Sequence, residues 1–125
     1  MENKDIELIC KAVCICGSRG WKDKKSIRSV IYSLHPDTIV IHGGAPGADT
    51  IAGNIAGNIA KSRGLNIEVY IPDWELYGKS AGPIRNRKMV SKSDVVFAFW
   101  DGKSKGTKNS IDTAIKLNKP VLVIK

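Results

Sequence analysis

The sequence predicts an α/β fold in which helices cover both faces of a mainly parallel, five-stranded sheet. Two observations support this fold: short β-branched segments alternate with segments of helical periodicity, and the connections between them are short. Strands joined in this way pair in parallel through right-handed crossovers. The chain has 125 residues, of which 42% are hydrophobic and 26% are charged. These values are typical of one soluble globular domain, here spanning residues 1–125.

The first strand is expected over residues 8–15. A helix follows over residues 24–34, where apolar residues recur at every third or fourth position. Pro36 ends this helix because proline disfavours the helical conformation of the residue before it. A β-branched segment then predicts a short second strand over residues 38–41.

The second helix begins near Ile51, since isoleucine recurs every four residues with alanine beside it. Gly53 and Gly57 each cost a helix about 1 kcal/mol relative to alanine. We therefore expect these glycines where the helix packs closely on the sheet.

The rest of the chain predicts three more strands and two more helices. The strands cover residues 67–71, 95–100 and 120–124, and the helices cover residues 83–92 and 107–117. Pro83 lies in the first turn of its helix, where proline is tolerated. This order of elements predicts a Rossmann-like three-layer sandwich, in which ligands bind beyond the carboxyl ends of the strands.

The charge balance is strongly basic. Twenty lysines and arginines against twelve acids give a net charge of +8. Eight of the basic residues and two of the acids lie between Lys79 and Lys108. This distribution indicates either an anionic partner or a plain solvated surface.

The chain shows no sequence signal for membranes or export. Residues 1–7 mix Glu, Asn, Lys and Asp and lack the apolar core of an export signal, and no uncharged run is long and apolar enough to span a bilayer. A cytoplasmic protein without a membrane partner is therefore expected.

Three cysteines lie close together in and just after the first predicted strand. Cys10, Cys14 and Cys16 share one parity, so they project from one face of the strand, where buried thiols are expected. Neither histidine stands at ligand spacing from them. We predict no metal site and no cofactor.

Glycine-rich loops follow the first, second and fourth strands. Glycine lets a ligand approach the backbone, and the N–H groups at a helix start attract anions. The loops are Gly17-Ser18-Arg19-Gly20-Trp21, Gly43-Gly44-Ala45-Pro46-Gly47-Ala48-Asp49 and Asp101-Gly102-Lys103-Ser104-Lys105-Gly106-Thr107. Two anion-binding helix starts on adjacent strands, the second and the fourth, favour one nucleotide as ligand. Neither a dinucleotide fingerprint nor a Walker loop is present.

The connection over residues 72–87 is long enough to cover a pocket. We interpret Trp74 as a pocket wall and Tyr77 as core packing. Asp49 and Asp73 are candidates for binding ribose hydroxyls. The alternatives are a helix cap for Asp49 and a turn residue for Asp73.

Together these motifs resemble the YspA-type, YpsA-related branch of the SLOG superfamily, with a more distant likeness to Lonely Guy phosphoribohydrolases and Smf/DprA proteins. The resemblance implies a homo-oligomeric domain that binds nucleotide-derived signals such as ADP-ribose relatives. The candidate ligand-binding residues are Gly17, Ser18, Arg19, Trp21, Gly43, Gly44, Ala45, Gly47, Ala48, Asp49, Asp73, Trp74, Lys79, Ser80, Arg85, Asn86, Asp101, Gly102, Ser104, Gly106 and Thr107.

Catalysis is less well supported than binding. Lonely Guy enzymes carry an arginine that Arg85 resembles, and a glutamate soon after Gly-Thr. Here Thr107 is followed by Lys108, Asn109 and Ser110, so the acid needed for glycosidic cleavage is missing from that position. No catalytic residue is assigned.

Three functions stay open, in descending order of support. The first is a module that senses or sequesters a nucleotide-derived small molecule. The second is a nucleoside-monophosphate phosphoribohydrolase or related N-glycosidase that uses Arg85 with Asp49 or Asp73. The third is nucleic-acid binding through residues 79–108, for which steep salt dependence is expected.

Overall fold

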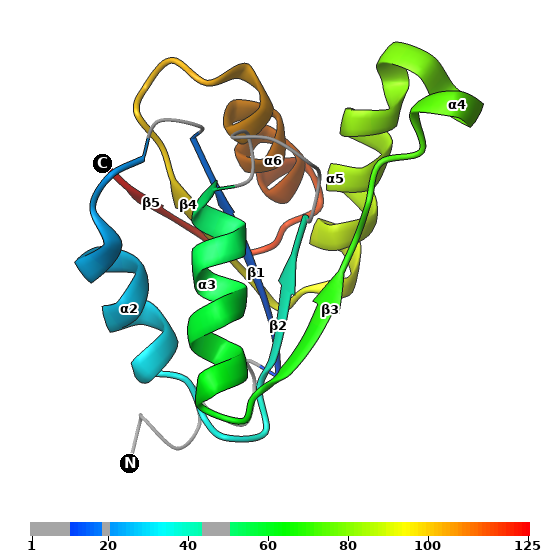
Figure 1. The fold of residues 1–125 in the computed structure, drawn as a ribbon. Helices are drawn as coiled ribbons and strands as arrows, with labels where there is room; N and C mark the ends of the chain where they lie inside the picture. The colour runs from blue at the N-terminus through cyan, green and yellow to red at the C-terminus, as the bar shows by residue number, and fades with distance from the viewer. Residues whose placement is uncertain (1–10, 19–20, 44–50) are drawn as a thin grey trace.

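The computed structural model describes residues 11–18, 21–43 and 51–125, with side chains from residue 55 onward in the last range (Figure 1). It confirms the predicted Rossmann-like α/β fold. The five strands are β1 (Ala12–Gly17), β2 (Ile39–His42), β3 (Asn66–Val69), β4 (Val95–Phe99) and β5 (Val121–Ile124). They pair in parallel in the order β3-β2-β1-β4-β5.

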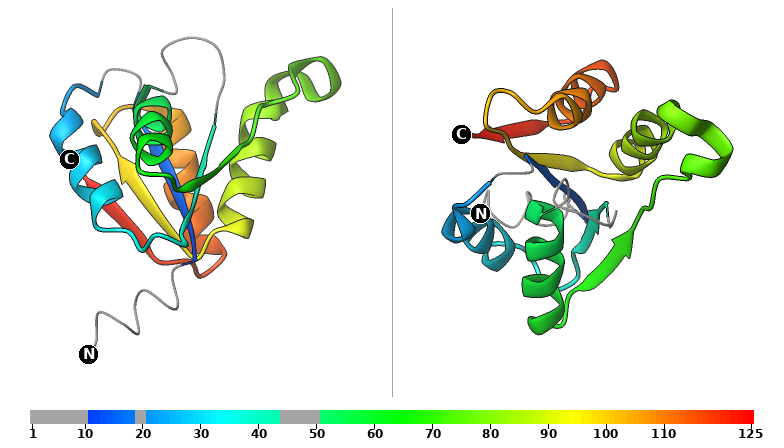
Figure 2. Two further views of the ribbon diagram at one scale, coloured as in Figure 1. Left: turned by 60° about the horizontal axis from the view of Figure 1, so that its bottom comes forward. Right: turned by 45° about the horizontal axis from the view of Figure 1, so that its top comes forward.

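Helices cover both faces of this sheet (Figure 2). Helices α2 (Lys24–Tyr32) and α3 (Ile51–Ser62) pack on one face, whereas α5 (Ala81–Lys92) and α6 (Lys105–Lys116) pack on the other. The short helix α4 (Trp74–Tyr77) and the 3-10 turn η2 (Gly78–Ser80) precede α5. None of the helices in the described residues combines the length and apolar character needed to cross a bilayer.

Side chains alternate between the two cores along β1. Val13 and Ile15 belong to the core beneath α2 and α3, whereas Cys14 and Cys16 belong to the core beneath α5 and α6. The expected common face of Cys14 and Cys16 is confirmed; Cys10 lies outside the described residues. This alternation is the two-residue period of a strand that is buried on both faces.

Close packing between α3 and the sheet occurs at Gly57. A Cβ atom added there would lie 2.5 Å from Nε2 of His42, a β2 side chain that is only 6% exposed. Any larger residue would overlap the imidazole unless His42 or α3 shifted. The predicted close approach is thus confirmed at Gly57, while the side of α3 at Gly53 lies outside the described side chains.

Several boundaries differ from the predicted ones by two or more residues. Helix α2 ends at Tyr32, and β3 ends at Val69, where its pairing with β2 stops. The connection predicted over residues 72–87 contains helical turns at residues 74–80, and Asp73 starts the first of them, α4, by accepting a hydrogen bond from the amide of Leu76 (3.0 Å). The side chain of Ser104 likewise starts α6 two residues earlier than predicted.

Candidate functional site

The candidate site opens at the carboxyl ends of β1 and β4. The chain leaves β1 toward α2 on one face of the sheet and leaves β4 toward α6 on the other. The strand order therefore reverses between β1 and β4, and α/β sheets bind ligands at such a crevice.

A cavity of about 470 Å³ lies there, between β1, α5 and α6. This volume falls in the range of small-molecule sites, about 300–1,000 Å³. It is lined by Ile15, Cys16, Gly17, Gly43, Arg85, Asn86, Met89, Asp101, Lys103, Ser104, Lys105, Gly106, Thr107 and Ser110.

Arg85 places a guanidinium group in the cavity lining. Its Nη1 donates to the carbonyl of Tyr70 (3.3 Å), and its guanidinium lies against the backbone at the end of β2. A Cβ atom added to Gly43 would lie 2.8 Å from Cζ of Arg85 and closer still to Nη1. Gly43 is therefore the residue that admits the guanidinium to this position.

Asn86 connects Arg85 to α6. Its Oδ1 accepts a hydrogen bond from Nε of Arg85 (2.9 Å). Its Nδ2 donates to Oδ1 of Asn109 (3.0 Å) and to the carbonyl of Gly106 (3.4 Å). Since Asn86 is only 6% exposed, this buried network holds the arginine relative to the start of α6.

The start of α6 supplies backbone donors. Oδ1 of Asp101 accepts from the amides of Lys103 and Ser104, both at 2.8 Å, and Oγ of Ser104 accepts from the amide of Thr107 (3.3 Å). The remaining first-turn amides, those of Lys105 and Gly106, have no acceptor among the described residues. These two N–H groups, at the positive end of the helix dipole, are the ones able to bind an anion.

Charges in the cavity favour an anionic ligand. Arg85, Lys103 and Lys105 outnumber Asp101 among the lining residues. The amides of Lys103 and Ser104 lower the pKa of Asp101, so its carboxyl group is ionised at neutral pH. Among the described residues, the lining therefore combines excess positive charge with one carboxylate, that of Asp101.

Cys16 is the thiol in the wall. Burial raises its pKa to about 12, and a hydrogen bond to Ser110 and the charge of Arg85 only partly oppose this effect. Its Sγ lies 3.8 Å from the carbonyl of Phe97. Cys16 therefore stays protonated at neutral pH and contributes an apolar surface rather than a nucleophile.

The structure brings eight of the 21 sequence-predicted ligand-binding residues together in the cavity lining and leaves seven others outside it. The lining contains Gly17, Gly43, Arg85, Asn86, Asp101, Ser104, Gly106 and Thr107. The seven outside the lining are Ser18, Trp21, Asp73, Trp74, Lys79, Ser80 and Gly102. The other six, Arg19, Gly44, Ala45, Gly47, Ala48 and Asp49, lie outside the described residues.

Ser18 and Trp21 make structural contacts. The buried Ser18 donates its amide to the carbonyl of Phe99 (2.8 Å), and its Oγ accepts from the amide of Asp101 (2.9 Å). The ring of Trp21 packs edge to face on Phe99, with centroids 5.6 Å apart. Its Nε1 donates to the carbonyl of Asp23 (3.0 Å). The contacts with Phe99 fix Ser18 and Trp21 against the end of β4.

The aromatic residues of α4 do not enclose the cavity. Trp74 is 52% exposed and Tyr77 is 40% exposed, and neither lines it. Trp74, interpreted as a pocket wall, does not line this cavity, and Tyr77, interpreted as core packing, is exposed instead. The helical turns at residues 74–80 hold both rings away from the core.

The second and fourth strands are not adjacent, contrary to the prediction. Strand β1 lies between β2 and β4, because the chain returns past β1 after β3 and adds β4 on its far side. Helices α3 and α6 consequently start on opposite faces of the sheet. The strands that precede them, β2 and β4, lie on either side of β1 rather than next to each other.

Six lining residues were not predicted from sequence: Ile15, Cys16, Met89, Lys103, Lys105 and Ser110. Lys103 and Lys105 belong to the third glycine loop, and Ser110 lies one helical turn after Thr107, so helical spacing was a usable signal for it. Across the described part of the chain, no three His, Cys, Asp or Glu residues gather as metal ligands would.

Both a family model and a known phage protein match the sequence of this chain. The model of the YspA, cpYpsA-related SLOG family matches residues 11–77. The Gene 61 protein of Mycobacterium phage D29 is 40% identical over 119 residues, which cover 90% of this chain and 94% of that protein.

Solved structures of DNA processing protein A (DprA) share the fold. The Streptococcus pneumoniae protein superposes with a TM-score of 0.72 at 19% identity, and the chain spans 97% of its own length but 52% of that protein. The Helicobacter pylori protein, described for its single-stranded DNA binding mode, gives a TM-score of 0.65 at 25% identity over 95% of this chain and 67% of that one.

The family match covers more than half of the chain, and the phage relative matches along nearly its whole length. Both agree with the glycine-loop motifs that suggested the SLOG superfamily. This chain belongs to the YspA, cpYpsA-related SLOG family.

Proposed function

We propose that the cavity between β1, α5 and α6 binds a nucleotide-derived small molecule through a phosphate group. The main observation in support is the position of Arg85. Gly43 leaves space for its guanidinium, and hydrogen bonds through Asn86 connect it to the start of α6. A guanidinium and two helix N-terminal amides form a favourable setting for a phosphate.

The carboxylate of Asp101 supports a sugar beside that phosphate. It is ionised, lies in the same lining and can accept hydrogen bonds from ribose hydroxyls. A phosphate next to a ribose is the chemistry shared by nucleoside monophosphates and ADP-ribose.

We also propose that the chain forms a homo-oligomer. Sedimentation in the analytical ultracentrifuge measures its mass in solution and checks this proposal.

Binding for sensing or sequestration is favoured over cleavage. Glycosidic hydrolysis usually employs a pair of carboxyl groups, one of them protonated to act as the acid. Asp101 is the one described carboxylate in the lining, and backbone donors lower its pKa. Asp73, a candidate acid in the hydrolase alternative, caps α4 outside the cavity.

The test is identification and titration of the ligand. The purified chain is denatured, and the small molecules that it releases are identified by mass spectrometry. The stripped chain is then titrated by calorimetry with AMP, ADP-ribose and NAD. We expect saturable binding that Arg85→Met weakens strongly and Arg87→Met leaves unchanged, because Arg87 lies on the same helix outside the cavity lining. Equal binding by both variants would refute the site.

Nucleic-acid binding is the second candidate function. It is favoured by the single-stranded DNA binding of the Helicobacter pylori relative and by the excess of basic residues between Lys79 and Lys108. Binding of an oligonucleotide that weakens steeply with added salt would support this candidate, since phosphate contacts release counterions. Absent or salt-insensitive binding would dismiss it.

A further inference from the structure

Exposed apolar side chains concentrate next to α5. Nine large apolar residues are exposed in the described part of the chain, and five of them, Val69, Ile71, Trp74, Leu76 and Tyr77, lie between residues 69 and 77. A folded domain rarely exposes so many in one short segment without a binding role. The two aromatic residues, Trp74 and Tyr77, both belong to α4.

Basic side chains flank these aromatic residues. The segment from Lys79 to Lys92 contains five basic residues and no acid. Arg85 faces the cavity, which leaves Lys79, Arg87, Lys88 and Lys92 on the exposed side. We call Trp74, Tyr77 and these four residues the α4–α5 ridge.

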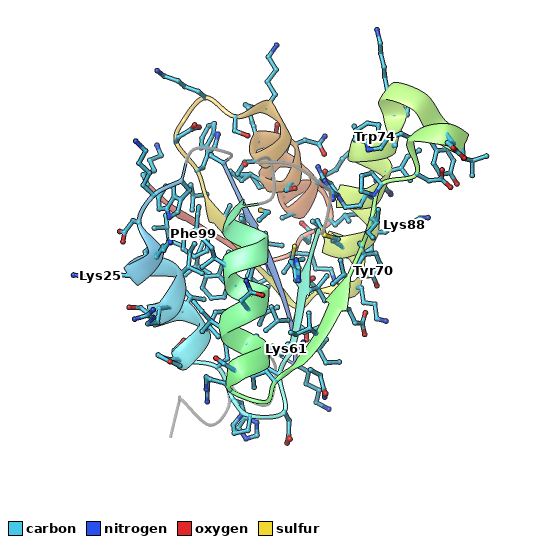
Figure 3. All side chains as sticks on the ribbon, in the orientation of Figure 1. Lys25, Lys61, Tyr70, Trp74, Lys88 and Phe99 are labelled. Atoms are coloured by element: carbon cyan, nitrogen blue, oxygen red, sulfur yellow. The ribbon has the colours of Figure 1, made fainter. Side chains whose placement is uncertain are left out.

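A contact between Lys88 and Tyr77 joins the basic and aromatic parts of the ridge, and Trp74 packs beside the start of α5. Nζ of Lys88 lies 5.9 Å from the ring centroid of Tyr77, and Cη2 of Trp74 faces Gly82 at the start of α5. Below them, an open groove of about 500 Å³ is lined by Tyr70, Arg87, Lys88, Ser91 and Lys92. Figure 3 shows the labelled side chains of Trp74, Lys88 and Tyr70 following one another along α5.

The acids near the ridge leave this surface net positive. Glu68 pairs with Lys92, with Nζ and Oε1 3.1 Å apart, and Asp73 is engaged as the cap of α4. Glu75 is the remaining exposed acid on α4. Lys79, Arg87 and Lys88 have no carboxylate partner within 4.0 Å among the described residues.

We infer that the α4–α5 ridge binds single-stranded DNA, with bases stacked on Trp74 and Tyr77 and the backbone along the basic side chains. Exposed rings beside cations are the combination that holds single strands without reading their sequence. A DNA duplex would contact only the basic side chains, because its bases are already stacked within the helix. An acidic protein would likewise pair with the basic side chains without stacking on Trp74 and Tyr77.

This inference rests on the second candidate function and adds the surface, the strand type and the mode of contact. The ridge is separate from the nucleotide cavity, since none of its six residues lines that cavity. The two sites adjoin through Arg85, whose Nη1 donates to the carbonyl of the groove residue Tyr70. Variants of the ridge should therefore leave AMP binding by the cavity intact.

The test is fluorescence anisotropy with a labelled oligo-dT of about 15 nucleotides. We expect Trp74→Leu to weaken binding about tenfold, and Trp74→Phe, which keeps a ring, to restore most of it. The double variant Arg87→Gln/Lys88→Gln should weaken binding and reduce the slope of log affinity against log salt by about 1.4. The matched control is Lys25→Gln/Lys61→Gln, which removes the same charge from α2 and α3 on the opposite face of the sheet (Figure 3).

The outcomes distinguish failure of the α4–α5 ridge as the binding surface from failure of nucleic-acid binding itself. If wild type binds oligo-dT and the ridge variants behave like the control pair, the ridge is refuted while nucleic-acid binding stands. If the folded chain does not bind oligo-dT at all, both fail. Equal competition by duplex DNA or by polyglutamate at matched charge would refute the stacking role of Trp74 and Tyr77.

Discussion

Replacing Gly43 by alanine isolates the position of Arg85. The glycine does not adopt a positive φ angle, so its backbone suits alanine. The new methyl group would lie 2.8 Å from Cζ of Arg85. The far end of a flexible side chain can move aside, so we expect the fold to persist and the guanidinium to leave the cavity.

The expected losses can be estimated separately for binding and for stability. A hydrogen bond to a charged group contributes about 1.5–3 kcal/mol, which corresponds to about a 10- to 150-fold loss of affinity. The free energy of unfolding should change by no more than about 1 kcal/mol, since alanine also restricts the unfolded chain. Calorimetric titration with AMP measures the first quantity, and urea denaturation measures the second.

Gly82→Ala is the matched control for this substitution. A Cβ atom at Gly82 would lie 3.6 Å from Cη2 of Trp74, which is an ordinary contact, and Gly82 is outside the cavity lining. We expect unchanged AMP affinity and equal or higher stability. The reasoning is refuted if Gly43→Ala binds AMP as tightly as Gly82→Ala while Arg85→Met abolishes binding, because the guanidinium would then tolerate the methyl group.

Four further predictions concern stability and reactivity. Gly57→Ala should lower the free energy of unfolding by about 1 kcal/mol or more in urea denaturation, because the methyl group overlaps the buried imidazole of His42; unchanged stability would contradict the packing. Burial lowers the pKa of His42 below 6.5. The unfolded chain therefore takes up a proton at a higher pH than the folded chain, and the free energy of unfolding should fall as the pH drops below about 6.5. His42→Gln should flatten this part of the plot of stability against pH, and an unchanged plot would contradict the role of His42. Cys14 and Cys16 should escape iodoacetamide in the native protein at about pH 8, since burial raises the pKa of both; peptide mass spectrometry would detect labelling that disproves this. Ser104→Ala should cost about 1 kcal/mol in thermal unfolding by removing the cap of α6; a cost near zero would show that the cap is dispensable.

The sequence was sufficient to predict the layers of the fold. The apolar periods of the helices and the β-branched strands identified the alternation, and parallel crossovers then followed from the short connections. The common face of Cys14 and Cys16 was predictable because strand parity is local. The close approach at Gly57 was predictable because a glycine that weakens a helix indicates close packing. The order of the strands was not predictable, because no local sequence pattern indicates that the chain passes β1 after β3 and adds β4 on its far side.

Residues of the candidate site were predictable where they belong to a glycine loop or to the Arg85-Asn86 pair. Glycine content could not separate ligand contacts from packing. Ser18 and Trp21 occupy such a loop, yet their hydrogen bonds and ring contacts join β1 to β4. Nor could composition show that Ser104 and Asp101 satisfy three of the amides expected to meet a ligand.

A direct test of the central proposal is the titration of ¹⁵N-labelled protein with AMP, observed in ¹H–¹⁵N correlation spectra. The proposed phosphate position predicts the largest shifts at the amides of Lys105 and Gly106 and at Nε–H of Arg85, with small shifts along α2. Saturating shifts confined to other parts of the chain, or none with AMP, ADP-ribose or NAD, would contradict it.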